Sequence, residues 1–374
     1  MTGALDTIRV LDMTRILAGP WASQLLGDYG ADVVKIERPG AGDDTRQWGP
    51  PWLGKQSAYF LSTNRNKRSV TVDISTEQGQ RVIRDLAAQA DVLLENYKVG
   101  TLARYKLDPA ELMASNEGLI VCSISAFGQA GSRAADPGYD AMIQASGGLM
   151  SITGAPDSEG GGPQKVGVAI ADIMAGMYAA TAVLAALHAR AQTGKGQQID
   201  VPLFDSQVAW LANQNMNYLV GGSVPTRMGT AHPNLVPYQA FATRDGNLML
   251  AVGNDRQFAA CMACLDLETL AAQDKFVDNA ARLENRNELV ERIQDRLCAN
   301  TTDYWLAAFA AAQVPAGPIN DIGDALGSAH AREKHLVRYL KNAAGDDVPI
   351  VANPVDLGAT PVAYERPPPL LGEH

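Results

Sequence analysis

The stretch IRVLDMTRILAGPWASQLLGDYGADVVKIERPG, residues 8–40, decides the fold class because it alternates two kinds of secondary structure. IRVLDM is a short apolar run that predicts a strand, residues 18–30 predict a helix that ends at Gly30, and DVVKIERPG predicts a second strand. A strand, a helix and another strand in succession indicate a parallel βαβ unit with a right-handed crossover.

The alternation continues to residue 128. It predicts a helix at TEQGQRVIRDLAAQA and strands at SVTVDIS (69–75), DVLLENY (91–97) and GLIVCSISAFG (118–128). We therefore expect an α/β protein with a large Rossmann-like, doubly wound domain. Ligands bind beyond the carboxyl ends of such strands, which here precede residues 14–19, 37–40, 96–100 and 125–128. The turn TRILAGP lacks G-x-G-x-x-G, which argues against a dinucleotide cofactor.

The character of the sequence changes near residue 225. GNLMLAVGN contains strand-like runs, and residues 255–311 are mostly helical in pattern with many charges. This predicts a second, smaller α+β domain. The chain ends in RPPPLLGEH, which its prolines stiffen into an extended segment.

Composition narrows the class of partner. A net charge of −10 over 374 residues argues against a broad nucleic-acid-binding surface and favours a small molecule. Four cysteines and an N-terminus without a signal-peptide pattern favour the cytoplasm. No histidine or cysteine has metal-ligand spacing, so no metal site is predicted. G-x-S-x-G is absent as well, which argues against a serine hydrolase.

The segment VAIADIMAGMYAATAVLAAL, residues 168–187, carries one charge, Asp172. Its length fits a membrane span, but an aspartate costs about 2.5–3.5 kcal/mol near a bilayer centre, so a helix that is buried in the protein interior and apolar on nearly every face is favoured. Asp172 is then a candidate N-cap of a helix that begins at Ile173. The helix dipole would keep the acid ionised, and an accessible carboxylate can attack an activated acyl group, so both roles stay open.

Seven segments along the whole chain resemble the class III (family III) CoA-transferases, the group of formyl-CoA and carnitine-type enzymes. They are residues 11–46, YFLSTNRNKRSVTVDI (59–74), DVLLENY (91–97), PGYDAMIQASGGLMSITG (137–154), residues 168–187, ARAQTGKGQQIDVPLFDS (189–206) and RPPPLLGEH (366–374). The resemblance is specific because several long motifs agree in order.

The resemblance implies a large domain over residues 1–224, a small domain over 225–325 and a segment, 326–374, that returns to the large domain. It also implies a homodimer of two interlocked subunits. The family's catalytic aspartate falls on Asp172. A glycine-rich loop over the reacting group would be Gly160–Gly162 or Gly229–Asn234. The implied coenzyme A contacts are Arg38, Val72, Asp73, Ser75, Asn96, Tyr97, Arg104 and Tyr139.

The resemblance further implies the reaction. Asp172 would attack an acyl-CoA to give a mixed anhydride, which the thiolate converts to an aspartyl-CoA thioester that a free acid then attacks. Coenzyme A is a substrate here, and no permanent cofactor is needed.

The sequence is most similar to the dicarboxylate branch of the family, the succinate-hydroxymethylglutarate (glutarate) type. This implies succinyl-CoA as donor and a dicarboxylate such as glutarate as acceptor. Arg15 is the candidate for holding the distal carboxylate, with Arg46 or His232 assisting, and Leu17 and Ala18 line the acid's pocket. Leu17 is apolar where an oxalate-handling member would need a polar group.

Two alternatives stay open. α-Methylacyl-CoA racemases share the fold but use a histidine where this chain has Tyr139, and a tyrosine with a pKa near 10 is a poor base at neutral pH. The second alternative is an acyl-CoA-binding protein without catalytic activity. The presence of Asp172 at the family's catalytic position argues against it.

Overall fold

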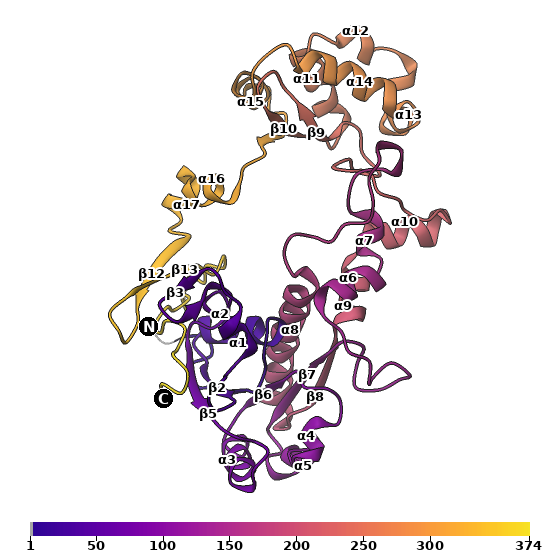
Figure 1. The fold of residues 1–374 in the computed structure, drawn as a ribbon. Helices are drawn as coiled ribbons and strands as arrows, with labels where there is room; N and C mark the ends of the chain where they lie inside the picture. Colours follow the sequence, from indigo (N-terminus) through magenta and orange to yellow (C-terminus); the bar gives the residue numbers. More distant parts are fainter. Residues whose placement is uncertain (1–2) are drawn as a thin grey trace. The chain divides into compact units, whose positions relative to one another are not determined.

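The structure is a computed structural model that describes residues 3–374, and its chain forms two compact units (Figure 1). The first comprises residues up to 150, residues 165–224 and residues 329–374, and the second comprises residues 151–164 and 225–328. These units group residues 151–164 with the middle of the chain rather than with its N-terminal part. The domain division 1–224, 225–325 and 326–374 stays a prediction.

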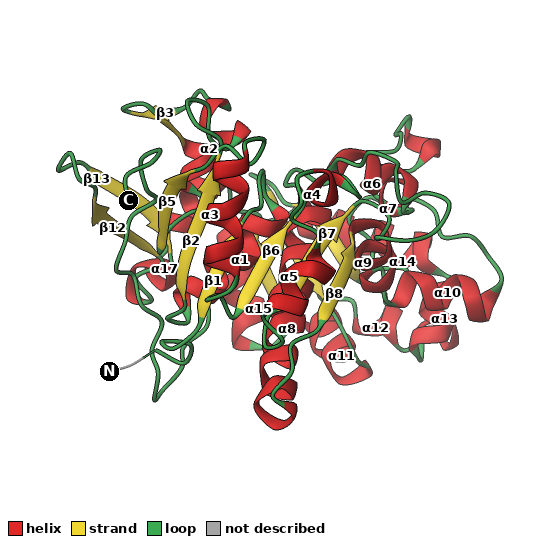
Figure 2. Cartoon of the chain, turned by 90° about the horizontal axis from the view of Figure 1, so that it is seen from below, coloured by secondary structure: helices red, strands yellow, loops and turns green. Residues whose placement is uncertain are grey.

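The first unit is built on a six-stranded sheet in which all neighbouring strands are parallel. Figure 2 shows its strands in the order β5 (Lys67–Thr71), β2 (Asp32–Glu37), β1 (Arg9–Asp12), β6 (Val92–Glu95), β7 (Ile120–Ser125) and β8 (Gln198–Pro202). In chain order this is 3-2-1-4-5-6, the Rossmann arrangement. The predicted parallel α/β sheet is confirmed. The order in which the chain adds strands to the sheet reverses between β1 and β6.

Both faces of the sheet are covered by helices. Successive strand residues point to opposite faces, so Val10 packs with α1 (Ala18–Asp28) and α8 (Ile170–Thr193), whereas Leu11 packs with α3 (Glu77–Ala87). Strands buried on both faces explain why they read as nearly continuous apolar runs.

Helix α8 is buried on one side only within this chain. It lies beside α1 (Figure 1), and small residues allow the close approach: a Cβ at Gly176 would lie 2.5 Å from the Ala18 carbonyl oxygen. On the other side, Met177, Tyr178 and Leu184 are exposed. The predicted burial of this apolar helix in the protein interior is therefore only partial within the described residues. The helix is long and apolar enough to span a membrane by length and composition, but its alanine-rich side is part of the sheet's core.

Strand β5 differs from its prediction at residues 69–75, since it begins at Lys67 and ends at Thr71. Lys67 is fully buried, and its ammonium group lies 3.2 Å from Asp12. A lysine in sequence indicates a solvated position. The predicted strand begins two residues after the observed one, because the burial of Lys67 depends on Asp12, which is distant in the sequence.

The second unit has a small antiparallel sheet in the order β11 (Ala316–Pro318), β10 (Asn247–Ala251) and β9 (Tyr238–Ala242). Its core joins Leu248 and Phe241 of the sheet to Trp305 of a flanking helix. The helices that follow β9 and β10 along the chain are α11 (Asp255–Cys264), α12 (Glu268–Ala271), α13 (Asn279–Glu284), α14 (Arg286–Leu297), α15 (Thr302–Ala311) and, after β11, α16 (Ile322–Gly327).

The C-terminal residues pack on the edge of the first unit's sheet. After the hairpin β12 (Val337–Lys341) and β13 (Asp347–Val351) the chain has no further helix or strand up to His374, turns at residues 371–372, and donates from the His374 N–H to the Ser69 carbonyl (3.1 Å). The remaining helices and strands are β3 (Trp52–Leu53), β4 (Gln56–Ser57), α2 (Ala58–Leu61), α4 (Thr101–Arg104), α5 (Pro109–Ser115), α6 (Asp140–Ser146), α7 (Leu149–Ile152), α9 (Leu203–Trp210), α10 (Asn213–Gly221) and α17 (Ala329–Glu333).

Candidate active site

Asp172 lies in the first turn of α8, but it is not the N-cap. The helix begins at Ile170, three residues before the predicted start, and Ala169 occupies the cap position. Asp140 caps the helix instead: its Oδ1 accepts from the backbone N–H of Ala171 (2.8 Å) and, more weakly, of Asp172 (3.4 Å). The predicted cap role is therefore wrong, and the Asp172 carboxylate is not used in capping α8.

The Asp172 carboxylate lies in an environment that disfavours its charge. Burial, and then the neighbouring Asp140 carboxylate, raise the pKa of Asp172 to about 7. The expectation that the helix terminus keeps this acid fully ionised is thus not met at neutral pH. A pKa shifted this far by burial and a charged partner is typical of functional sites.

A cavity of about 190 Å³ in the first unit contains Asp172. Its lining includes the predicted site residues Arg15, Leu17, Ala18, Asn96, Tyr97 and Tyr139. They follow the carboxyl ends of β1 and β6 or precede α6, so the point where the strand order reverses brings them together.

A second cavity of about 610 Å³ shares Arg15 and Tyr97 with the first. It is lined by four further residues of the predicted coenzyme A set, namely Arg38, Val72, Asp73 and Ser75. Arg104 is exposed at the end of α4, and its guanidinium lies 5.8 Å from the ring of Tyr105, which lines this cavity. All of the predicted set except Arg104 therefore lines two adjoining cavities of one unit.

Arg15 is held at the boundary between the two cavities. Its Nη1 lies 2.9 Å from Asp44, and its guanidinium carbon lies 5.6 Å from the centre of the Tyr97 ring. Its Nε is buried without a hydrogen-bond partner among residues 3–374. A buried N–H left unpaired costs about 1–3 kcal/mol, so an anionic ligand at this position would gain from binding it.

Arg46 is committed to the fold. Its Nε and Nη2 bind the two carboxylate oxygens of Glu37 at 2.7 and 2.6 Å, and it donates to the Pro369 carbonyl (3.2 Å). The guanidinium carbon lies 3.7 Å from the centre of the Phe60 ring. These contacts tie the C-terminal tail to the sheet, and the predicted help of Arg46 in substrate binding stays a prediction.

His232 and both candidate covering loops belong to the second unit. The carbonyl oxygen of His232 accepts from Arg286 (2.8 Å), and its ring packs at 5.1 Å from the ring of Tyr238. Gly229 at the start of the second loop is bound to the segment that precedes the first, since its N–H donates to the Gly154 carbonyl (3.0 Å). The roles of His232 and of these loops stay predictions.

Comparison with known proteins decides the family. The model of CoA-transferase family III matches residues 5–374. The chain belongs to CoA-transferase family III. It is 45% identical to succinate–glutarate CoA-transferase of Agrobacterium fabrum, over 99% of this chain and 93% of that protein. It is 42% identical to human succinyl-CoA:glutarate CoA-transferase, over 99% and 84% of the two chains. Among solved structures, a CaiB/BaiF family protein from Brucella suis is 44% identical, with a TM-score of 0.87 over 100% and 98% of the chains.

Two residues beside the nucleophile candidate of this family III CoA-transferase were missed in the sequence. One is Asp140, although it directly follows Tyr139 in PGYD. The other is Tyr59 on α2: burial, and then the Asp172 and Asp140 carboxylates, raise its pKa to about 12. The Tyr59 phenol therefore stays protonated near Asp172. No local pattern marks it, because α2 is distant from α8 in the sequence.

Proposed function

We propose that this family III CoA-transferase moves coenzyme A from succinyl-CoA to a free dicarboxylate such as glutarate. The observation that carries the proposal is the shared cavity of Asp172 and Arg15, which combines a carboxylate of raised pKa with a cation that has an unpaired buried N–H. The relatives named for transfer between succinyl-CoA and glutarate, similar over nearly the whole chain, support the choice of acids.

The proposed chemistry runs through Asp172 in covalent steps. A carboxylate oxygen of Asp172 attacks the thioester carbon of succinyl-CoA, the C–S bond breaks, and a mixed anhydride and the CoA thiolate form. The thiolate attacks the Asp172 acyl carbon, which releases succinate and leaves an aspartyl-CoA thioester. Splitting one transfer into such steps lowers each barrier. Tyr59, held protonated, is placed in this mechanism as a donor to the developing oxyanions.

The acceptor completes the cycle in the reverse sense. Its carboxylate attacks the aspartyl-CoA carbonyl and expels the thiolate, which then attacks the acceptor's acyl carbon and frees Asp172. In this proposal Arg15 binds the acceptor's second carboxylate, exchanging part of its contact with Asp44. The buried side chains of Leu17 and Ala18 cover the apolar carbons between the two carboxylates.

Coenzyme A itself is proposed to lie along the larger cavity. Arg38 has a largely exposed side chain at the end of β2 and can pair with a phosphate, and Val72, Asp73 and Ser75, which follow β5, line the same cavity. Asn96, Tyr97, Arg104 and Tyr139 are the other residues proposed for this ligand. No permanent cofactor takes part in the scheme.

We also propose that the active form is an interlocked homodimer in the cytoplasm, with small molecules rather than nucleic acid or membrane as partners. The exposed apolar residues of α8 and α10 support the dimer, because such groups gain free energy when a second subunit covers them. They are Met177, Tyr178, Leu184, Met216, Tyr218, Leu219 and Val220.

A screen of acceptors tests the proposed function. Purified protein is incubated with succinyl-CoA and one free acid at a time, and the acyl-CoA products are identified by mass spectrometry. We expect glutaryl-CoA and related dicarboxyl thioesters, with much slower reaction for monocarboxylates of equal length. In heavy water, a chiral 2-methylacyl-CoA should gain no α-deuterium. Deuterium uptake without CoA transfer would replace the proposal with the racemase reaction.

The pH dependence of the rate follows from the raised pKa of Asp172. Because only the ionised carboxylate attacks, kcat/KM should fall as the pH drops below about 7 and level off above it. Asp140→Asn removes the like charge but keeps an acceptor for the α8 N–H groups, so it should move this limb to lower pH. The measurement is kcat/KM for succinyl-CoA from acidic to mildly alkaline pH, and an unmoved limb would contradict the assigned cause.

A further inference from the structure

The turn between β1 and α1 has its backbone held by side chains from distant segments. Asn96, which follows β6, binds Arg15 twice: its Oδ1 accepts from the Arg15 N–H (2.9 Å), and its Nδ2 donates to the Arg15 carbonyl (2.7 Å). The oxygen and the nitrogen of the Asn96 amide thus each bind one of the peptide groups on either side of the Arg15 side chain.

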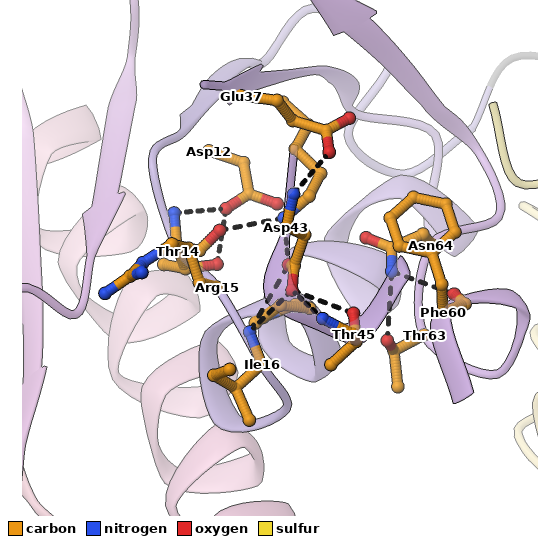
Figure 3. Close-up of polar contacts among 12 residues, drawn as sticks. Asp12, Thr14, Arg15, Ile16, Glu37, Asp43, Thr45, Phe60, Thr63 and Asn64 are labelled. Carbon is orange, nitrogen blue, oxygen red and sulfur yellow. Dashed lines mark hydrogen bonds and ion pairs between the residues drawn. The ribbon is translucent and has the colours of Figure 1, made fainter. Parts of the chain in front are cut away.

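Charged side chains hold the neighbouring peptide groups of the same turn (Figure 3). Asp12 Oδ1 accepts from the Thr14 N–H (2.9 Å), and Asp43 accepts from the Ile16 N–H (3.2 Å to Oδ1). Lys35 Nζ donates to the Thr14 carbonyl (2.8 Å) and lies 3.0 Å from Asp43. Every backbone polar group from Thr14 N to Ile16 N thus has a side-chain partner.

These contacts hold Ile16 in an unfavourable conformation. Its φ is +72°, in the left-handed region that a β-branched side chain rarely adopts. Such a residue persists only where its surroundings impose the conformation, and strain of this kind clusters at functional sites. Ile16 and the residues on either side of it, Arg15 and Leu17, all line the Asp172 cavity. The backbone conformation of this strained turn therefore sets the position of the Arg15 side chain in the cavity.

The Lys35–Asp43 pair contributes more to geometry than to stability. Neither side chain has any exposed surface, and burying two charges costs about as much free energy as their attraction returns. Burial opposes a charge on Lys35, yet the carboxylates around it, Asp43 foremost, hold its pKa above the ordinary value. Apolar residues could fill the same space. They could not donate to the Thr14 carbonyl and accept from the Ile16 N–H at once.

We propose that Lys35, Asp43 and Asn96 form a turn clamp, a set of positioning residues that fixes residues 14–16 so that Arg15 meets the second carboxylate of the acceptor. This inference rests on the proposed dicarboxylate transfer. None of the three needs to touch the reacting atoms. Their effect is on selectivity for dicarboxylates, exerted through Arg15.

The test compares acceptors in clamp variants. Asn96→Ala removes both bonds to Arg15, and we expect it to raise the KM for glutarate about tenfold, while the KM for pentanoate, the monocarboxylate of equal length, changes much less. Lys35→Met/Asp43→Asn should give the same split. If that double variant fails to fold, Asn96→Ala carries the test alone, since it leaves no buried charge unpaired.

Asn116→Ala is the matched control. Asn116 donates to the Ala87 and Ala90 carbonyls (3.0 and 2.9 Å) in the same unit and lines neither cavity. Its loss should lower the melting temperature without changing the ratio of the two KM values. If Asn96→Ala changes the ratio of the two KM values no more than Asn116→Ala does, the proposed turn clamp is wrong.

A double-mutant cycle separates positioning from a general loss of structure. Glycine adopts positive φ without strain, so a turn that contains Ile16→Gly needs the clamp less. Asn96→Ala should then raise the KM for glutarate about tenfold in the wild-type background but less than about threefold in the Ile16→Gly background. Equal effects in both backgrounds would overturn the inference. Absence of dicarboxylate transfer by the wild-type protein would instead overturn the proposed function.

Discussion

Asp172→Ala is expected to lower kcat for CoA exchange between succinyl-CoA and glutarate by on the order of 10⁴-fold or more, because removal of a covalent nucleophile leaves only binding and electrostatic effects. The protein should stay folded, since Asp140 rather than Asp172 caps α8. The measurement is the initial rate of glutaryl-CoA formation, beside a thermal melt. Asp85→Ala, at an exposed position on α3, is the control and should keep full activity.

The raised pKa of Asp172 also predicts how the stability of the protein depends on pH. The pKa of Asp172 is raised from 3.8 to about 7 in the folded chain, so the wild-type protein loses stability as the pH rises through that interval. Asp172→Asn has no such loss. Its melting temperature should exceed that of the wild type by an amount that grows from pH 4 to pH 7 and then stays constant. Wild-type-like turnover in Asp172→Ala would contradict the nucleophile, whatever the melts show.

Arg15→Ala is expected to raise the KM for glutarate roughly 10- to 100-fold, which corresponds to the loss of a hydrogen bond to a charged group. Pentanoate should be affected far less, because it has no second carboxylate for Arg15 to bind. The measurement is the pair of KM values at saturating succinyl-CoA. Arg81→Ala, on the exposed side of α3, is the matched control. An equal increase for both acids would remove Arg15 as the anchor of the distal carboxylate.

The parts of the fold that could be predicted are those that depend on local pattern. Apolar runs separated by helical segments predicted the parallel sheet of the first unit, and the rule on carboxyl ends pointed to residues 14–19 and 96–100. The structure brings Arg15 and Tyr97 from those segments together at both cavities. Strands buried on both faces leave an unambiguous trace in the sequence, because nearly every position must be apolar.

What could not be predicted depends on partners far away in the sequence. Lys35 and Lys67 read as surface residues but are fully buried, because Asp43 and Asp12 neutralise them. The pairing of Arg46 with Glu37 likewise has no trace in the local sequence. Asp172 resembles an N-cap because the carboxylate that does cap α8 comes from another helix. Periodicity and propensity carry no information on such pairings.

The central claim is that Asp172 becomes covalently linked to coenzyme A, and the sequence around it allows a direct measurement. Trypsin should release residues 166–190 as one peptide, VGVAIADIMAGMYAATAVLAALHAR, in which Asp172 is the only acidic side chain. After incubation with succinyl-CoA alone and an acid quench, mass spectrometry should find this peptide heavier by coenzyme A less one water. Added glutarate should remove the label. An unlabelled peptide in a preparation that actively forms glutaryl-CoA would contradict the claim.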